Sequence, residues 1–204
     1  MIKVLFLGCH VDDIELGCGG TIHKKKNEWQ INCLTLSQSS YSPLGINGPH
    51  PEIWKRQRES FDFLGVQGKW LSHRTNFFYE ERNELYASLS KEKDITKPDI
   101  VFTQSCDEHQ DHETLHKETL RVFQNSSIIE YHIPRSQRSF CPNYYQSLAE
   151  ENVNCKIQSL QFYDMYRNKI YFQEDFIRSQ LIQNGCYIGE KYAESFRIIQ
   201  LIER

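Results

Sequence analysis

The chain contains continuous apolar runs, and segments with helical spacing of apolar residues lie between them. The runs are KVLFLG, INCLTLS, KPDIVFTQS, SSIIEYHI and SFRIIQLI, at 3–8, 31–37, 97–105, 126–133 and 195–202. Strands without polar alternation are typical of a sheet that is buried on both faces. A short strand is expected at 69–72, and helices are expected at 14–27, 52–65, 80–90, 112–123, 150–168 and 174–184. The alternation predicts an α/β fold, a Rossmann-like three-layer α/β/α arrangement with a mainly parallel sheet.

Length, charge and composition narrow the class of protein. A chain of 204 residues is long enough for one domain with a real core, and we expect a single domain over 1–204. The net charge is −3 and no basic stripe is present, which argues against nucleic acid as a partner. No apolar stretch approaches the roughly 20 residues of a membrane span, and the run at 1–8 is too short for a signal peptide. We therefore expect no membrane span and a cytoplasmic location, and a homo-oligomer is possible.

The seven cysteines are odd in number, scattered, and form no CxxC pair. This pattern indicates neither a disulfide framework nor a thiolate zinc site. We expect most of them to be small buried apolar residues.

Polar side chains follow two of the apolar runs. His10, Asp12 and Asp13 come after the first run, and a histidine-rich segment at 109–116 follows the run at 97–105. Ligands of such sheets bind beyond the carboxyl ends of the strands, so the two clusters should meet in space. Imidazole and carboxylate suit zinc, iron, manganese or cobalt, and two histidines with one aspartate leave an open position, as in catalytic metal sites.

Simpler interpretations exist for each cluster taken alone. The two aspartates can cap the helix that follows them, and the segment at 109–116 can be a solvated helix start. The glycines of GCGGTI do not form GxGxxG, and we interpret them as allowing close helix–strand packing. Spacing alone does not say which aspartate would hold a metal.

The motifs resemble those of a known family. GCHVDDIELGCGGTI looks like the AHPDDxELGxGGT opening of the LmbE-like, or PIG-L, zinc-dependent de-N-acetylases, and HQDHETLH resembles their second motif. RQRESFDFLGV, KPDIVFT and EKYAESF match further segments, so the resemblance spans nearly the whole chain. One departure is Val11, where proline is usual.

The resemblance implies roles for individual residues. The metal ligands fall on His10, Asp13 and His112, and the general base that takes a proton from the attacking water falls on Asp12. Asp111 would orient a histidine, and His109 would stabilise the oxyanion or act as an acid. The implied cofactor is one Zn²⁺ per chain, with Fe²⁺ or another divalent metal as an alternative.

The implied activity is hydrolysis of the N-acetyl group of an amino sugar, either a small molecule or carrier-linked, of the kind used in polysaccharide assembly. Alternatives are hydrolysis of another N-acyl group, such as formyl, and a non-catalytic glycan-binding module with a vestigial metal site.

The substrate is expected over loops 38–51, 73–80 and 132–143. Arg74 is the candidate for binding a substrate hydroxyl or phosphate, although an ordinary surface salt bridge explains it equally well, and Arg56 is a weaker candidate. Four aromatic residues can stack on a sugar face, or belong to the core or rim: Tyr41, Phe77, Phe78 and Tyr79.

Overall fold

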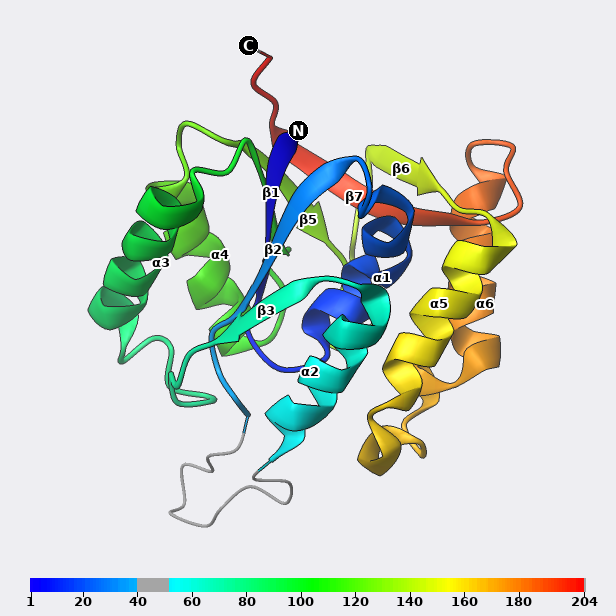
Figure 1. Cartoon of the computed structure of the whole chain (residues 1–204), viewed down its shortest axis with the longest axis horizontal. Helices are drawn as coiled ribbons and strands as arrows, with labels where there is room; N and C mark the ends of the chain where they lie inside the picture. Colours follow the sequence, from blue (N-terminus) through cyan, green and yellow to red (C-terminus); the bar gives the residue numbers. More distant parts are fainter. Residues whose placement is uncertain (40–51, 204) are drawn as a thin grey trace.

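A computed structural model describes residues 1–39 and 52–203 as a seven-stranded sheet with helices on both faces (Figure 1). The strands are β1 (Ile2–Gly8), β2 (Trp29–Thr35), β3 (Gln67–Trp70), β4 (Ile100–Gln104), β5 (Ser127–Tyr131), β6 (Tyr144–Ser147) and β7 (Ala193–Gln200). The helices are α1 (Asp13–Lys25), α2 (Ile53–Leu64), α3 (Arg82–Thr96), α4 (Gln110–Val122), α5 (Glu150–Gln161) and α6 (Glu174–Cys186). Two short 3₁₀ turns follow α5, at Asp164–Tyr166 and Ile170–Phe172.

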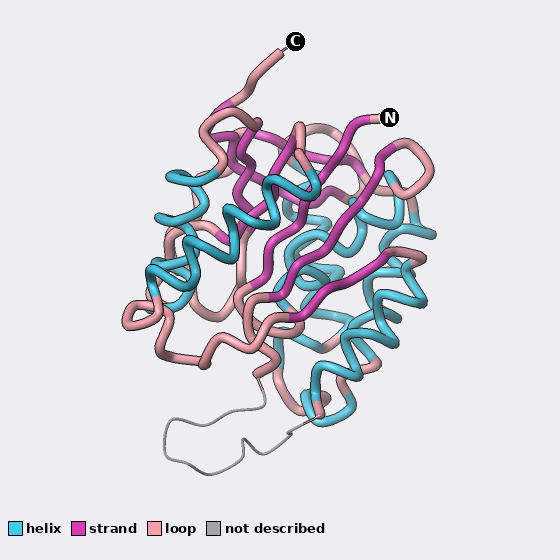
Figure 2. The backbone as a smooth tube through the Cα atoms, turned by 60° about the vertical axis from the view of Figure 1, so that its left-hand side comes forward, coloured by secondary structure: helices cyan, strands magenta, loops and turns pink. Residues whose placement is uncertain are grey.

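The strand order is β3-β2-β1-β4-β5-β7-β6. The five strands from β3 to β5 are parallel, and β7 pairs antiparallel with both β5 and β6. Figure 2 shows these strands running side by side through the centre of the molecule. The predicted mainly parallel, three-layer α/β fold is confirmed.

Alternate residues of β1 face two separate cores. Val4 and Phe6 pack with α1, α2, α5 and α6, whereas Leu5 and Leu7 pack with α3 and α4. Figure 1 shows the same division, with α3 and α4 on one side of the sheet and the other four helices opposite. Because both faces are covered, β1 has no need of polar residues, which explains its continuous apolar sequence.

The structure corrects several element boundaries. The helix expected over 150–168 ends at Gln161, because Tyr163 turns inward and its hydroxyl donates to the buried carboxylate of Glu15 at 2.7 Å. Strand β6 was not expected at all. Helix α3 continues beyond the expected 80–90 to Thr96, and β3 begins two residues before the expected strand at 69–72.

The cysteine expectation was wrong in part. All seven thiols are free, but only Cys9, Cys18 and Cys33 are buried, whereas Cys106, Cys141 and Cys186 are exposed. The three buried ones lie in or beside β1, α1 and β2, the elements at the centre of the fold.

The chain leaves β1 toward β2 on one side and leaves β4 toward β5 on the other. Strands β1 and β4 are neighbours, with Phe6 paired to Phe102. The loops after these two strands leave the sheet edge in opposite directions, and the place between them is a topological switch point. Such a switch point is where ligands bind in open parallel sheets. Among the described residues, no helix is both long and apolar enough to cross a bilayer.

Candidate metal centre and catalytic cavity

Two loops at the carboxyl edge of the sheet bring histidine and aspartate side chains together. The first loop follows β1 and carries His10 and Asp12, and Asp13 begins α1. The second follows β4 and carries His109, the N-cap of α4, while His112 lies in the first turn of that helix. The two motifs, about 100 residues apart in sequence, therefore meet in space, as the sequence predicts.

Asp13 is the centre of these contacts. Its Oδ2 accepts hydrogen bonds from the backbone N–H of His10 at 2.8 Å and from the Gln104 amide at 2.7 Å. The same oxygen lies 3.7 Å from His10 Nδ1 and 3.6 Å from His112 Nε2. Two ligands that are each about 2.0–2.1 Å from a tetrahedral zinc ion lie about 3.4 Å apart. The three side chains fit a divalent metal with only small adjustments.

His112 has one nitrogen bonded and one nitrogen without a partner. Its Nδ1 lies 2.7 Å from Asp107 Oδ2, and Ser136 donates to the same carboxylate oxygen at 2.5 Å. Its Nε2 is buried and has no hydrogen-bond partner among the described residues. A buried polar atom without a partner is costly, and a metal ion would satisfy it. Among these contacts, this orphaned nitrogen is the strongest indication that the three side chains can bind a cation.

His10 is held by a buried carboxylate. Its Nε2 lies 2.9 Å from Asp111 Oδ2, and Asp111 also accepts the backbone N–H groups of Asn76 at 2.6 Å and Phe78 at 3.2 Å. These bonds tie the first motif to the loop after β3. With Nε2 bonded to Asp111, Nδ1 is the nitrogen of His10 left to interact with Asp13 and a metal.

His109 reaches the same place from the second loop. Its Nδ1 accepts the backbone N–H of Asp111 at 3.2 Å. One nitrogen each from His10, His109 and His112 lie within 4.8 Å of one another, and so do ligand atoms of Cys9, Asp13 and His112. The cluster therefore holds more ligand-type atoms than one tetrahedral ion needs.

The charges of the cluster respond to one another. Burial opposes charge on both His112 and Asp13, but their mutual attraction outweighs it. The pKa of His112 rises to about 10, helped by Asp107, and the pKa of Asp13 falls to about 2. Without a metal the two side chains form an ion pair, and a cation bound there would take the place of the proton.

His109 and Asp12 have pKa values shifted toward the neutral form. Burial, with the charges of His10 and His112, lowers the pKa of His109 to about 4. Burial, and next to it the charge of Asp13, raises the pKa of the Asp12 carboxyl well above its ordinary value. Both residues are therefore perturbed in the manner of groups that handle protons.

The sequence profile of the family described as PIG-L: GlcNAc-PI de-N-acetylase matches residues 5–123, which is 119 of the 204 residues and includes both motifs. The chain belongs to the PIG-L family. The resemblance seen in the sequence is confirmed.

Individual proteins extend the likeness of this PIG-L chain beyond the profile. The uncharacterized deacetylase YaiS of Escherichia coli (strain K12) is 27% identical over 169 residues, covering 77% of this chain and 88% of that protein. The conserved protein TT1542 of Thermus thermophilus superposes with a TM-score of 0.77 at 20% identity, covering 100% and 97% of the two chains. The N,N′-diacetylchitobiose deacetylase of Pyrococcus horikoshii gives 0.72 at 23% identity, covering 97% and 84%. These two structures share the fold.

A cavity of about 510 Å³ opens over this candidate metal site of the PIG-L family chain. Asp12, Asp13, His10, His109 and His112 all line it. Its other walls come from the two expected loops that the structure describes in full, at 73–80 and 132–143, and from the 3₁₀ segment after α5. The expected loop 38–51 contributes Ser39, and its remainder, with Tyr41, lies outside the described residues.

The substrate-binding side chains expected from sequence, so far as they belong to the described residues, do not line this cavity. Arg74 does not line it, and its guanidinium pairs with Glu81 and lies 3.6 Å from Glu80. Phe78 is fully buried beside His10, and Tyr79 is 76% exposed and points to no described cavity. The aromatic residues that do line the cavity are Tyr166 and Tyr171.

Sequence reasoning missed several residues of the site. Gln104, the last residue of β4, donates a hydrogen bond to Asp13, and Asp107, between β4 and the second motif, pairs with His112. A polar Gln104 at the end of a buried strand was an available signal. His116, which belongs to the same histidine-rich segment, instead lies 3.1 Å from the buried Glu130, away from the metal cluster.

Proposed function

We propose that this PIG-L chain is a metal-dependent hydrolase that removes the N-acetyl group from an N-acetylated amino sugar or its glycoconjugate. The observation that carries the proposal is the buried, unpartnered Nε2 of His112, 3.6 Å from Asp13 Oδ2, in the wall of the cavity. Family membership supports amide hydrolysis, and the deacetylase names of two of the similar proteins support an acetylated substrate.

The hydrogen bonds of the three histidines support His10, Asp13 and His112 as the ligands. A neutral imidazole carries one N–H and one lone pair. His10 donates through Nε2 to Asp111, and His112 donates through Nδ1 to Asp107. The other nitrogen of each ring, which lies 3.6–3.7 Å from Asp13 Oδ2, has a lone pair that would bind a metal. A carboxylate is a typical hydrogen-bond partner for the second ring nitrogen of a metal-ligating histidine.

His109 has the opposite arrangement. Its Nδ1 accepts the backbone N–H of Asp111, so the proton of the neutral ring lies on Nε2. A ring nitrogen that carries a proton is a hydrogen-bond donor and not a metal ligand. This supports His109 as the group that stabilises the oxyanion of the tetrahedral intermediate.

A zinc ion, or another divalent ion such as Fe²⁺, would polarise the acetyl carbonyl and acidify the attacking water. Asp12 takes a proton from that water as its oxygen adds to the carbonyl carbon, and returns the proton to the leaving nitrogen. The C–N bond breaks, the free amine leaves, and the carboxylic acid that forms releases the second proton of the water to solvent and leaves as acetate. Asp111 and Asp107 hold the two histidines in place and take no part in proton transfer.

The test is acetate release and metal content measured together. The purified chain, stripped with a chelator and then supplied with zinc or ferrous ion, is assayed on N-acetyl, N-formyl and N-propionyl glucosamine. We expect about one metal per chain and metal-dependent acetate release. Faster release of formate would favour the formyl alternative. Stoichiometric metal with no hydrolysis of any substrate would favour a glycan-binding module, and failure to bind any divalent metal would overturn the site.

A further inference from the structure

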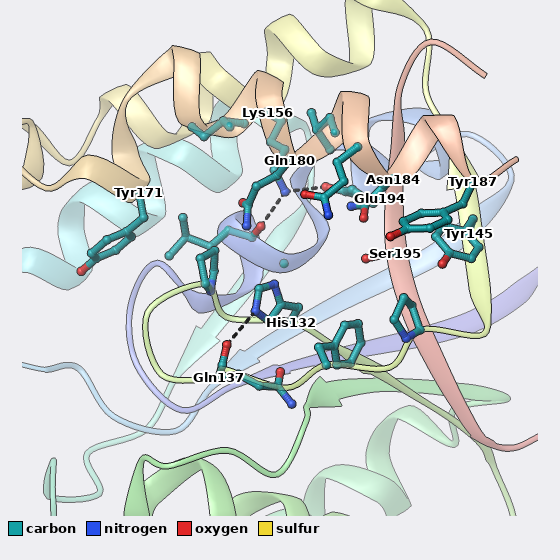
Figure 3. A pocket seen from close by; sticks show the side chains of 18 of the residues that line it. His132, Gln137, Tyr145, Lys156, Tyr171, Gln180, Asn184, Tyr187, Glu194 and Ser195 are labelled. Carbon is teal, nitrogen blue, oxygen red and sulfur yellow. Dashed lines mark hydrogen bonds and ion pairs between the residues drawn. The ribbon is translucent and has the colours of Figure 1, made fainter. Parts of the chain in front are cut away.

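A second cavity lies beside the catalytic one, between α6, β7, α1 and the loop that follows β5 (Figure 3). Its volume is about 510 Å³, which is within the range of roughly 300–1,000 Å³ of ligand pockets. None of the five residues to which we give a role at the metal or in proton transfer lines it. The proposed reaction therefore makes no use of this space.

The two cavities adjoin. Leu16, Arg138 and Tyr171 line both of them. Figure 3 shows Tyr171 at one end of the second cavity, with Tyr145 and Tyr187 at the other end. A ligand whose acetamido group lies over the metal cluster can therefore continue past Tyr171 toward the tyrosine pair.

Aromatic rings line the second cavity along its length. The rings of Tyr145 and Tyr187 lie 5.9 Å apart, and those of His132 and Phe140 stack at 5.4 Å. Tyr187 is 67% exposed, so much of its ring is open to a ligand in the cavity that it lines. Flat rings that are open on one face suit the apolar face of a sugar ring or a planar base.

Polar groups without protein partners complete the wall. Gln180 and Asn184 lie on the face of α6 that borders the cavity, as Figure 3 shows, and their amides form no hydrogen bond within the described part of the chain. Lys156 and Glu194 differ from them, because their ion pair is closed at 2.6 Å and buried. The free amides offer donors and acceptors to a hydroxyl-rich ligand.

Positive charge gathers where the cavities meet. Arg135, Arg138 and Lys169 line the catalytic cavity, and Lys169 Nζ lies 3.1 Å from the centre of the Tyr166 ring. Neither arginine forms an ion pair with a described carboxylate, and the segment 40–51 contains no Asp or Glu. A guanidinium group in a cavity wall without an ion-pair partner favours a ligand oxyanion, which it can bind in bidentate fashion.

We propose that the second cavity is a subsite for the remainder of an extended substrate, whose N-acetylated sugar bears an oxyanion at Arg138 and is joined there to a further polar ring. The proposal rests on the proposed deacetylase function and names its substrate class. The oxyanion is a phosphate or a carboxylate, and the experiment separates the two.

The experiment measures kcat/KM for acetate release from five compounds. N-acetylglucosamine has neither charge nor extension, and N,N′-diacetylchitobiose has extension alone. N-acetylglucosamine 1-phosphate and N-acetylmuramic acid add a phosphate or a carboxylate, and UDP-N-acetylglucosamine combines phosphate with an extending ring. We expect a charged group and an extending ring each to raise kcat/KM. Whichever of the phosphate and the carboxylate raises kcat/KM more identifies the oxyanion that Arg138 binds.

Two substitutions and two matched controls test the residues. Arg138→Gln should lower the ratio of kcat/KM for the charged compounds to kcat/KM for the neutral ones by about 10- to 100-fold. This is the usual contribution of a hydrogen bond to a charged group. Tyr187→Ala should lower the preference for extended over short compounds. Arg58→Gln on the outer face of α2 and Ile182→Ala, exposed on α6, are the controls and should change neither ratio.

Calorimetric binding to the Asp12→Asn variant gives a readout that does not require turnover. One outcome is that charged compounds bind more tightly, that Arg138→Gln weakens this binding, and that the unmodified chain deacetylates none of the compounds. This outcome would support the subsite and reject the proposed activity. Equal deacetylation of all five compounds, with Arg138→Gln and Tyr187→Ala indistinguishable from their controls, would reject the subsite and keep the activity.

Discussion

At Asp12 the backbone enters the left-handed region, with φ 97° and ψ −27°. A non-glycine residue there is strained, and such strain collects at functional sites. Asp12 is the N-cap residue of α1, yet its side chain makes no capping hydrogen bond. The carboxylate of Asp12 therefore does not cap α1, which argues against the simpler interpretation of this aspartate. Asp12 lines the cavity instead.

Asp12→Asn should fold and bind metal but turn over at least about 100-fold more slowly, because an amide cannot accept the proton. Asp13→Ala should instead lose metal, because one of three protein ligands is gone. Metal stoichiometry and kcat for both variants are the measurements. A metal-free Asp12→Asn beside a metal-loaded, slow Asp13→Ala would show that the two roles are reversed.

His109→Ala should lower kcat by roughly 100-fold or more while the metal content stays at the unmodified level, as expected for losing one donor to the oxyanion. The comparison variant is His112→Ala, which should lose the metal. Elemental analysis alongside kinetics distinguishes the two. Loss of metal from His109→Ala would make His109 a ligand, a role that its distance from the other two histidines allows.

At the scale of elements, α1 begins with Asp13 of the proposed metal site, and the position of this helix depends on close packing. A Cβ added at Gly17 would lie 2.1 Å from Cδ2 of Tyr131, whose ring is fully buried. The Tyr131 hydroxyl donates to the backbone carbonyl of Leu7 at 2.6 Å, so the ring is fixed in place. The glycines of the first motif therefore allow helix–strand contact, as we expect from the sequence.

Gly17→Ala should lower the free energy of unfolding by about 1–3 kcal/mol through overpacking against Tyr131. Gly19→Ala is the matched control on the same helix, because its Cβ would meet only Lys156, with Cγ the nearest atom at 3.2 Å. Both variants gain helix propensity of about 1 kcal/mol, which offsets the milder contact at Gly19 but not the 2.1 Å overlap at Gly17. Denaturant unfolding of both variants gives the difference, and equal stabilities would contradict this account of the packing.

The elements differ in how far the sequence could predict them. The strands β1 and β4 were predictable because continuous apolar runs have few other uses. The segment after α5 was not, because its helical spacing is overruled by one tertiary contact, the bond of Tyr163 to Glu15. That segment supplies Tyr166, Lys169 and Tyr171 to the cavity, so the error in the helix also concealed part of the site.

At the scale of the whole molecule, the proposed metal site joins parts of the chain that are far apart in sequence. Its residues come from loops after β1 and β4, and Asp111 fastens the loop after β3 to the same point through the N–H groups of Asn76 and Phe78. The residue types and their meeting place followed from the sequence pattern. The partners Asp107 and Gln104 did not, because only the three-dimensional structure shows which side chain each of them reaches.

A ligand that binds only the folded chain stabilises it, by about 2.7 kcal/mol at a concentration 100 times its dissociation constant. For a chain of this length, 1 kcal/mol corresponds to about 2–4 °C in Tm. Zinc added to the chelator-treated chain should therefore raise Tm by about 5–10 °C. The measurement is a thermal melt with and without zinc for the unmodified chain, Asp13→Ala and Arg58→Gln. Asp13→Ala should lose most of the shift, because Asp13 Oδ2 lies within 3.7 Å of a nitrogen of both His10 and His112. Arg58→Gln should keep the full shift, because Arg58 is an exposed residue of α2 that pairs with Asp62. An equal shift in Asp13→Ala would place the stabilising metal elsewhere on the molecule and contradict the proposed centre.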